Sequence, residues 1–288
     1  MSSSTAQRWD ELKPLLRLDG KGCKEFLHGQ TSADVKTSEV NNLLPSCWLT
    51  TTGRIKALLE IRLDDQGADV VVLAGDSDGL AQGFEQVIFP TDHVRLQPLR
   101  SIRRLQAMEP IKAGNPPKVA WLHPDAELPS TWASREPASL DQVERWRIEQ
   151  GLPLGTGELN GETNPFELGL AAWMSLSKGC YLGQEAIAKL ARSAETTKQL
   201  RCWQSDQPIP AGKNLIIPGS SAKESKRAGR ITSAIAFTDP KGEIPIGSIG
   251  LALVRHQALH ADELVVAEDS SKVRLSIPPG WISPTASN

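Results

Sequence analysis

The chain contains the stretch Lys178-Gly179-Cys180-Tyr181-Leu182-Gly183-Gln184-Glu185, in which reactive and structural residue types stand close together. Its few apolar residues follow neither the helical nor the strand period, a pattern that is typical of a functional loop. The segment that follows, residues 184–190, has the composition and apolar spacing of a helix. We therefore expect the Cys180 thiol to lie close to the N-terminus of a helix.

Two positive groups are expected near the sulfur of Cys180. One is the ammonium group of Lys178, and the other is the partial positive charge of the unpaired amides at the helix start. Both favour the thiolate, which is the nucleophilic and metal-binding form of cysteine. A second interpretation stays open on spacing alone, because cysteine is often buried and packs as a small hydrophobe.

Length and charge limit the class of protein. With 288 residues, the chain is long enough for two or three domains. Its 32 basic and 34 acidic residues give a formal net charge of −2, so no overall basic field favours nucleic acid or an anionic membrane surface. We expect neither nucleic acid nor a membrane among its partners.

The chain has four widely separated cysteines and no Cys-x-x-Cys pair: Cys23, Cys47, Cys180 and Cys202. This usage argues against a self-contained zinc or iron–sulfur site and favours a reducing compartment. The first ten residues lack the apolar core of a signal peptide, and no apolar run reaches the ~20 residues of a membrane span. We therefore expect a cytoplasmic protein.

The N-terminal half is predicted to form an antiparallel α+β layer. Strands are predicted at residues 47–50, 55–63, 69–73 and 93–99. The first two flank a tight hairpin at residues 51–54, which contains Gly53. A helix is predicted over residues 76–89, with Asp76 as its N-cap.

A second helix is predicted to begin at Ser139 and to end at Gly151. Its apolar face is expected to contain Leu140, Val143, Trp146 and Ile148. In the last third of the chain, short apolar runs are separated by Pro and Gly, and they lie at residues 199–203, 215–217, 229–234 and 247–254. Such runs are typical of an all-β barrel.

Two motifs carry a family resemblance. Residues 178–185 read Lys-Gly-Cys-Tyr-x-Gly-Gln-Glu, and at residues 147–155 an Arg-x-Glu is followed by Gly-x-Pro. Both resemble signatures of the YgfZ family, the folate-binding relatives of the glycine-cleavage T protein (aminomethyltransferase) that assist iron–sulfur proteins. Further likenesses occur at residues 17–31, 53–56, 228–233 and 249–255, so the resemblance covers nearly the whole chain.

The resemblance implies an α+β fold of three domains in the arrangement of the T protein, with residues 1–195 as the folate-binding region. Within it, a discontinuous folate-binding domain would comprise residues 1–45 and 139–195, and a ferredoxin-like middle domain residues 46–138. Residues 196–288 would form the C-terminal β-barrel.

The resemblance also implies a site for tetrahydrofolate or a derivative. Glu149 would accept two N–H donors from the aminopyrimidine edge of a pterin, a bidentate pattern that suits a carboxylate. The other residues expected at the folate are Arg147, Tyr181, Gly183, Gln184 and Glu185. From the sequence alone, Glu149 also fits an exposed acid at a helix end, and the Tyr181 ring could pack in the protein rather than stack on a flat ligand.

One departure separates this chain from the aminomethyltransferases. In those enzymes the strand after the glycine-rich hairpin carries an acidic pair, and the matching positions here are Lys56 and Ala57. Neither residue is a ready substitute for the group that moves a proton at the reacting folate nitrogen. Glycine cleavage is therefore disfavoured.

The resemblance thus implies a tetrahydrofolate-binding protein, not a classical enzyme, that assists the assembly or repair of iron–sulfur clusters in client enzymes. Cys180 is expected to act as a reactive thiolate or as a transient metal ligand, with Lys178 beside it. One thiolate cannot complete the coordination of a cluster, so an assembly or client protein, or a small thiol, would supply the other ligands of a transient, shared cluster. Two alternatives stay open: a folate-dependent one-carbon transferase, and a folate-sensing regulator without chemistry of its own.

Overall fold

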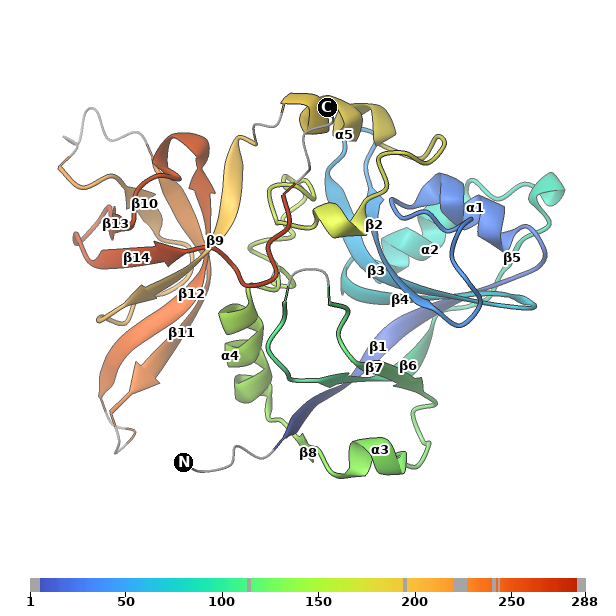
Figure 1. Ribbon diagram of the computed structural model, residues 1–288, viewed down its shortest axis with the longest axis horizontal. Coiled ribbons are helices and arrows are strands. Elements are labelled where there is room, and N and C mark those ends of the chain that lie inside the picture. The colour runs from blue at the N-terminus through green and yellow to red at the C-terminus, as the bar shows by residue number, and fades with distance from the viewer. Residues whose placement is uncertain are drawn as a thin grey trace. The chain divides into compact units, whose positions relative to one another are not determined.

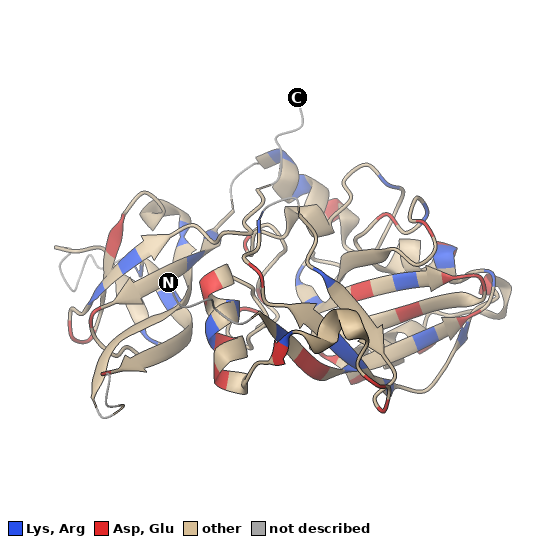
Figure 2. Ribbon diagram, turned by 60° about the horizontal axis from the view of Figure 1, so that its bottom comes forward, with Lys and Arg blue, Asp and Glu red and all other residues tan. Residues whose placement is uncertain are grey.

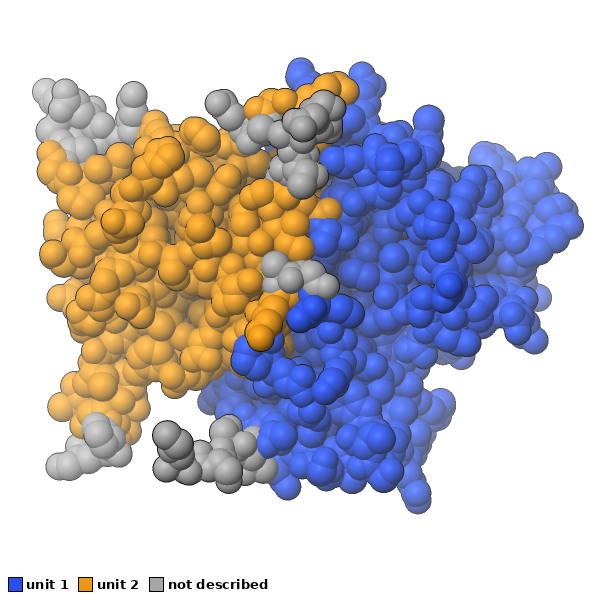
Figure 3. Space-filling model, in the orientation of Figure 1, with its two compact units in different colours: residues 1–110, 115–143, 172–189 blue, residues 111–114, 144–171, 190–288 orange. Residues whose placement is uncertain are grey.

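The structure, a computed structural model, describes residues 6–112, 115–193, 196–219, 227–239, 242 and 244–283. Residues 1–5, part of the segment expected to lack a signal peptide, lie outside the described residues. The chain divides into two compact units, which Figure 3 colours separately. Unit 1 comprises residues 1–110, 115–143 and 172–189, and unit 2 comprises residues 111–114, 144–171 and 190–288. The boundaries of the three expected domains stay a prediction.

Unit 1 is built on one sheet (Figure 1). Its main path runs in the order β2-β3-β4-β1-β6-β7, with antiparallel neighbours throughout. These strands are β1 (Gln7–Asp19), β2 (Leu43–Leu49), β3 (Ile55–Asp64), β4 (Gly67–Gly75), β6 (Arg100–Ala107) and β7 (Val119–Leu122). Two short strands also pair with β1: β5 (Arg95–Leu96) is antiparallel to it and β8 (Glu136–Pro137) is parallel.

The helices α1 (Cys23–Gln30) and α2 (Ser77–Glu85) pack against this sheet through a shared apolar core. Phe26 of α1 meets Phe84 of α2 edge to face, with ring centroids 5.3 Å apart, and Trp48 of β2 meets Phe84 at 6.1 Å. Burial of these side chains removes apolar surface from water and so stabilises two helices that are too short to be stable alone.

The sheet also carries ion pairs between its strands. Arg104 on β6 and Glu60 on β3 form a buried bidentate pair at 2.6 and 2.8 Å, and Arg103 on β6 pairs with Asp10 on β1 at 2.6 Å. Figure 2 shows basic and acidic residues interspersed along the strands. Side chains of opposite charge therefore pair across neighbouring parts of this sheet.

The predicted hairpin between β2 and β3 is confirmed, with Trp48 opposite Ala57 in the antiparallel register. Its turn is closed by a hydrogen bond of 2.8 Å from Thr50 N–H to Arg54 O. Gly53 in this turn has a φ of 74°, a left-handed conformation that glycine adopts without the strain of a side chain.

Asp76 caps α2 as predicted, because its Oδ1 accepts a hydrogen bond of 2.8 Å from Gly79 N–H. The prediction that this helix continues to residue 89 is wrong, since α2 ends at Glu85. Phe89 has an extended backbone and is followed by Pro90, which begins the 3-10 helix η1 (Pro90–Asp92). Proline disfavours the helical conformation in the residue before it, so the helix cannot run through Phe89.

The predicted strand at residues 93–99 is also wrong for most of its length. Only Arg95 and Leu96 form a strand there, and His93 has a φ of 53° that interrupts it. In contrast, β1 begins at Gln7, in a segment where no strand is predicted. Its first half is mostly polar and pairs with β6, so the neighbouring strand rather than apolar alternation makes it a strand.

The helix α4 (Leu140–Gln150) begins and ends as predicted. Ser139 Oγ accepts a hydrogen bond of 3.3 Å from Gln142 N–H, and Gln142 Oε1 accepts one of 2.8 Å from Ser139 N–H, which together form a capping box. Gly151 ends the helix with a φ of 70°. Three of the four residues expected on the apolar face are buried, but Leu140 is 85% exposed, because the whole first turn of α4 is exposed.

Unit 2 contains a closed β-barrel with the strand order β10-β11-β12-β9-β14-β13 (Figure 1). Its strands are β9 (Lys198–Ser205), β10 (Asn214–Ile216), β11 (Gly229–Thr238), β12 (Pro245–Arg255), β13 (Glu263–Val266) and β14 (Lys272–Ser276). The four predicted runs correspond to β9 to β12, and β13 and β14 complete the barrel. The predicted fold class, α+β with a C-terminal barrel, is confirmed.

The remaining described helices are short, apart from α5 (Gln184–Ser193), which follows the Cys180 loop. They are α3 (Ser130–Ala133) and the 3-10 helices η2 (Ala171–Trp173) and η3 (His256–Ala258). Among the described residues, no helix has both the length and the apolar character needed to cross a membrane.

Candidate functional site

The loop that carries Cys180 packs against the C-terminal end of α1 within unit 1. Two backbone hydrogen bonds attach it there, from Leu182 N–H to Gly29 O at 3.1 Å and from Ser175 N–H to Ser32 O at 2.9 Å. The motif is thus held by residues from the beginning of the chain, far from it in sequence.

Lys178 ties the same loop to the end of α1. Its ammonium group donates to three backbone carbonyl oxygens, those of His28 (2.6 Å), Thr31 (2.6 Å) and Ala33 (2.7 Å). A lysine ammonium has three donors, so all of them are used. Burial lowers the pKa of Lys178 from 10.5 to about 8, because the charged form loses its hydration. The structure gives Lys178 an anchoring role, and its predicted action on Cys180 stays a prediction.

Tyr181 is buried beside the same ammonium group. Lys178 Nζ lies 4.5 Å from the centroid of its ring, a cation–π contact. The hydroxyl group has no hydrogen-bond partner among the described residues, and burial raises its pKa to about 12. The ring therefore packs within the protein, and its contact with a ligand stays a prediction.

Gly183 lets the loop pass close to the β2–β3 hairpin. Its φ is 83°, and a Cβ atom there would come within 2.5 Å of Thr50 O, so no other residue fits without strain. Gln184, the first residue of α5, donates from Nε2 to Lys178 O at 3.2 Å. Glu185 is exposed in the first turn of α5. Gly183 and Gln184 therefore shape the loop, and of these three residues only Glu185 is exposed.

Cys180 is the most accessible of the four cysteines, all of which the structure describes. It is exposed, whereas Cys23 and Cys47 are buried and Cys202 is partly buried. Burial raises the pKa of Cys23 to about 11 and of Cys47 and Cys202 to about 12, which keeps these thiols protonated and inert. The described residues include no group of three or more His, Cys, Asp or Glu placed to hold a metal ion.

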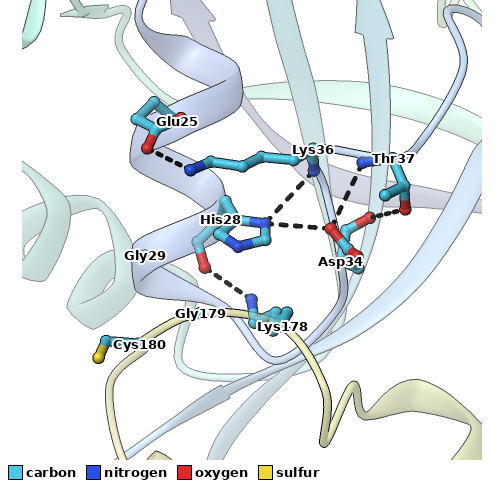
Figure 4. A pocket seen from close by; sticks show the side chains of 9 residues that line it. All are labelled: Glu25, His28, Gly29, Asp34, Lys36, Thr37, Lys178, Gly179 and Cys180. Atoms are coloured by element: carbon cyan, nitrogen blue, oxygen red, sulfur yellow. Dashed lines mark hydrogen bonds and ion pairs between the residues drawn. The ribbon is translucent and has the colours of Figure 1, made fainter.

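An open pocket of about 410 Å³ lies beside Cys180 (Figure 4). Its walls come from α1, from the segment after α1 and from the loop, and its lining residues are Glu25, His28, Gly29, Asp34, Lys36, Thr37 and 178–180. Only Lys178 and Cys180 are predicted site residues. The residues on the α1 side carry no signal in the sequence beyond the likeness of residues 17–31 to the opening of the family.

Arg147 belongs to a buried network in unit 2. Its guanidinium group has five donors, and each has an acceptor within the unit. Nε and Nη2 donate to Glu144 at 2.7 and 2.5 Å, Nη1 donates to Leu152 O at 2.8 Å and Glu158 at 3.5 Å, and Nη2 also donates to Ser233 Oγ at 2.9 Å. Arg147 therefore holds α4 to the loop after it and to β11, and its contact with folate stays a prediction.

Glu158 is a buried carboxylate that the sequence motifs do not single out. It accepts hydrogen bonds from Gly155 N–H at 3.0 Å and from Ser233 Oγ at 2.8 Å, and it is fully buried. Its charge is compensated by Arg147, eleven positions earlier. The only sequence signal for it is its place in the glycine-rich loop that follows the Arg-x-Glu motif.

Glu149 stands on the opposite, exposed side of the last turn of α4. Its carboxylate accepts a hydrogen bond of 2.8 Å from Arg145 Nε, and its side chain is 43% exposed. The group is thus oriented by a neighbour but remains accessible to a ligand. Glu149 belongs to unit 2 and Cys180 to unit 1, so a folate cavity shared by both residues stays a prediction.

Lys56 and Ala57 lie at the start of β3, directly after the hairpin. Ala57 is fully buried in the core of unit 1, and Lys56 is exposed, with its Nζ 3.6 Å from the centroid of the Trp48 ring. Neither position offers a carboxylate that could exchange a proton with a folate nitrogen.

A comparison with protein-family profiles finds no match. A chloroplast protein of Arabidopsis thaliana, provisionally named a transferase, is 34% identical over 136 residues, which are 47% of this chain and 29% of that protein. The mitochondrial iron–sulfur cluster assembly factor IBA57 of Mus musculus is 28% identical over 51% of this chain and 39% of its own. The tRNA-modifying protein YgfZ of Colwellia psychrerythraea is 33% identical over 29% of this chain and 26% of its own. The matches thus span well under half the length of these relatives.

A solved structure shares the fold over almost the whole chain. The aminomethyltransferase T of the glycine cleavage system from Bartonella henselae matches 97% of this chain and 88% of its own, with a TM-score of 0.71 and 16% identity. This likeness confirms the predicted fold of the T protein. The relatives named above support the resemblance of the motifs, because parts of the chain are similar in sequence to YgfZ and to IBA57.

Proposed function

We propose that this protein binds tetrahydrofolate or a derivative and assists the assembly or repair of iron–sulfur clusters in client proteins, with Cys180 as a reactive thiolate or transient ligand. The names of the relatives, an iron–sulfur cluster assembly factor and YgfZ, support this class of function. The observation that carries the proposal is the exposure of Cys180 at the edge of a pocket, while the other three thiols are buried or partly buried.

The cluster is the cargo of this function. A single exposed thiolate can form one bond to iron, and the remaining bonds must come from an assembly factor, a client protein or a small thiol. The reducing cytoplasm is the proposed compartment, since a free thiol persists there.

The exposed carboxylate of Glu149 fits the folate part of the proposal. A pterin presents adjacent N–H donors, and a carboxylate that is accessible and oriented by Arg145 can accept two of them. When bound, the folate would supply one-carbon or redox chemistry of its own. Glu149 would bind and orient it, and the buried Arg147 would hold the helix that carries Glu149.

One-carbon transfer is the second candidate, favoured by the aminomethyltransferase among the solved structures. That chemistry needs a group that moves a proton at the reacting nitrogen, and the buried Ala57 and the exposed Lys56 do not provide a carboxylate. The third candidate is a folate-sensing protein without chemistry. It requires Glu149 but not the sulfur of Cys180.

The test is complementation in cells that lack the protein, read from the activity of iron–sulfur enzymes. Cys180→Ser keeps the size of the side chain but loses the soft sulfur, so it should fold, bind tetrahydrofolate and fail to restore these enzymes. Cys202→Ser is the matched control, because it is the same substitution at a partly buried cysteine that does not line the pocket. Full restoration by Cys180→Ser, with loss in Glu149→Ala, would leave folate sensing as the function.

A further inference from the structure

The pocket beside Cys180 has features that the proposed function does not use. Cys180 lies at its edge, and in Figure 4 the sulfur points away from the ring of His28, which lies among the other lining side chains. The two residues thus contribute to one pocket from different sides. Both residues line this pocket, and Cys180 does so from its edge.

His28 brings a polar atom without a partner into this pocket. The residue is only 7% exposed, and burial, together with the nearby charge of Lys178, lowers its pKa from 6.5, so the ring is neutral at neutral pH. Its Nδ1 accepts a hydrogen bond of 3.3 Å from Lys36 N–H and lies 3.2 Å from Asp34 Oδ1. Its Nε2 has no hydrogen-bond partner within the described part of the chain. In either neutral tautomer, this nitrogen can form a hydrogen bond with a ligand atom, as a donor or as an acceptor.

The rim of the pocket carries charges of both signs. Lys36 Nζ pairs with Glu25 Oε1 at 2.5 Å, but the two side chains are 45% and 72% exposed. Ion pairs of this kind are weak, so each partner can be exchanged for a ligand group. The carboxylate of Asp34 is also partly exposed. A ligand with both an ammonium group and a carboxylate would find an opposite charge for each.

Two glycines keep the walls of the pocket open. A Cβ atom at Gly29 or at Gly179 would meet no heavy atom within 4 Å, and neither residue has a positive φ. Packing and backbone geometry therefore do not require glycine at these positions. The resulting volume, about 410 Å³, lies in the range of small-molecule sites.

We propose that this pocket binds a low-molecular-weight thiol of the amino-acid or short-peptide type, with its ammonium group at Asp34 or Glu25, its carboxylate at Lys36 and its sulfur at Cys180. This inference rests on the proposed function, in which Cys180 alone cannot complete the coordination of a cluster. It names the class of molecule that supplies a further soft ligand and the site that holds it.

The same arrangement predicts a reaction that needs no cluster. The Cys180 thiolate attacks one sulfur of the disulfide form of such a thiol, a new S–S bond forms and the S–S bond of the disulfide breaks. Cys180 is oxidised in this step, and the departing half of the disulfide is reduced, leaves as a thiolate and takes a proton from water. The disulfide is itself the oxidant.

The experiment uses the purified full-length chain and two disulfide probes. Glutathione disulfide carries the amino-acid and peptide groups, and 2-hydroxyethyl disulfide has no charged group. Mass spectrometry follows the mixed disulfide at Cys180 over time. We expect the rate with glutathione disulfide to saturate as its concentration rises, as required for binding before reaction, and the rate with 2-hydroxyethyl disulfide to rise linearly.

Gly29→Leu is the main variant, because Gly29 lines the pocket and a Cβ atom there meets no heavy atom within 4 Å, so a larger side chain can extend into the open space. It should lower the rate with glutathione disulfide by about tenfold and change the rate with 2-hydroxyethyl disulfide by less than about twofold. His28→Leu, which removes the unpartnered nitrogen, should change the two rates in the same way. Lys24→Leu is the matched control, since Lys24 is exposed on α1 but does not line the pocket.

A linear dependence for both probes, or an equal fall of both rates in Gly29→Leu, would overturn the proposal. If Gly29→Leu does not fold, as judged by thermal unfolding, the ratio of the two rates in His28→Leu decides in the same way. The assay contains neither folate nor a cluster, so it is independent of the complementation test. Saturation in the wild type together with full complementation by Cys180→Ser would reject the proposed function and retain the thiol pocket.

Discussion

Replacement of Lys178 by methionine removes the ammonium group that ties the Cys180 loop to α1. Methionine keeps an unbranched, flexible side chain of similar length, so the main change is the loss of hydrogen bonds. The carbonyl oxygens of His28, Thr31 and Ala33 would lose their shared donor in a buried place.

The size of the effect follows from two opposing terms. Hydrogen bonds from a charged donor contribute about 1.5–3 kcal/mol each, and Lys178 makes three of them. The lowering of its pKa from 10.5 to about 8 corresponds to roughly 3 kcal/mol against burying the charge at neutral pH. The expected net loss of unfolding free energy is therefore about 1.5–6 kcal/mol.

Urea unfolding, followed by tryptophan fluorescence, measures this loss. Lys189→Met is the matched control, because Lys189 is an exposed lysine on α5, where a substitution should change the free energy by less than about 0.5 kcal/mol. Limited proteolysis should cut the Cys180 loop faster in Lys178→Met, since its attachment is lost. If Lys178→Met is as stable as Lys189→Met, the anchoring role derived from the three hydrogen bonds is refuted.

The difference in unfolding free energy between the wild type and Lys178→Met should depend on pH in a defined direction. Below about pH 8, Lys178 is protonated in the folded and in the unfolded chain, so its contribution is constant. Between about pH 8 and 10.5, the unfolded chain holds a proton that the folded chain has lost, so the folded state gains up to roughly 3 kcal/mol as the pH rises. The wild type should show this gain and Lys178→Met should not. An equal difference between the two proteins at about pH 7 and pH 10 would contradict the lowered pKa.

Three further predictions concern the folate residue, the thiol and the loop. Glu149→Ala should weaken tetrahydrofolate binding by about 1.5–3 kcal/mol in a fluorescence titration, whereas Arg145→Ala, which removes only its neighbour on α4, should cost less; equal losses would mean that the pair binds as a unit. Iodoacetamide at about pH 8 should label Cys180 first, because burial raises the pKa of the other three thiols, and equal rates at all four sites would count against a distinct role for it. Gly183→Ala should lower Tm more than Gly161→Ala, because both have a positive φ but only a Cβ at Gly183 meets a backbone oxygen at 2.5 Å; equal Tm values would show that this contact does not matter.

Features that depend on contacts within a few residues could be predicted from the sequence. Asp76 caps α2 through an amide three residues later, and Ser139 and Gln142 form their capping box within the first turn of α4. Gly53 and Gly151 have the positive φ that a hairpin and a helix end require. Each of these arrangements involves residues within one turn of the chain, so no distant partner has to be known.

A strand that forms because it pairs with a strand far away in the sequence cannot be predicted from local sequence patterns. The first half of β1 is mostly polar and has no strand pattern, yet it pairs with β6 over residues that include Trp9 opposite Gln106. Its backbone groups are satisfied by that neighbour, which no local spacing reveals. The barrel was predicted in part. Strands β9 to β12 were predicted from their apolar runs, whereas β13 and β14 were found only in the structure, where they close the barrel.

For the candidate site, too, some features could be predicted from the sequence and others depend on the tertiary structure. The motif alone identified Cys180 and Lys178 as positions of interest and related the chain to the YgfZ-like proteins. The tertiary structure decided that Cys180 is exposed, that Lys178 turns inward to three carbonyl oxygens near residue 30, and that His28 lines the same pocket. The physical reason is that a buried charge must find hydrogen-bond partners, and which backbone groups are available is known only after the helix, the sheet and the loop have packed together.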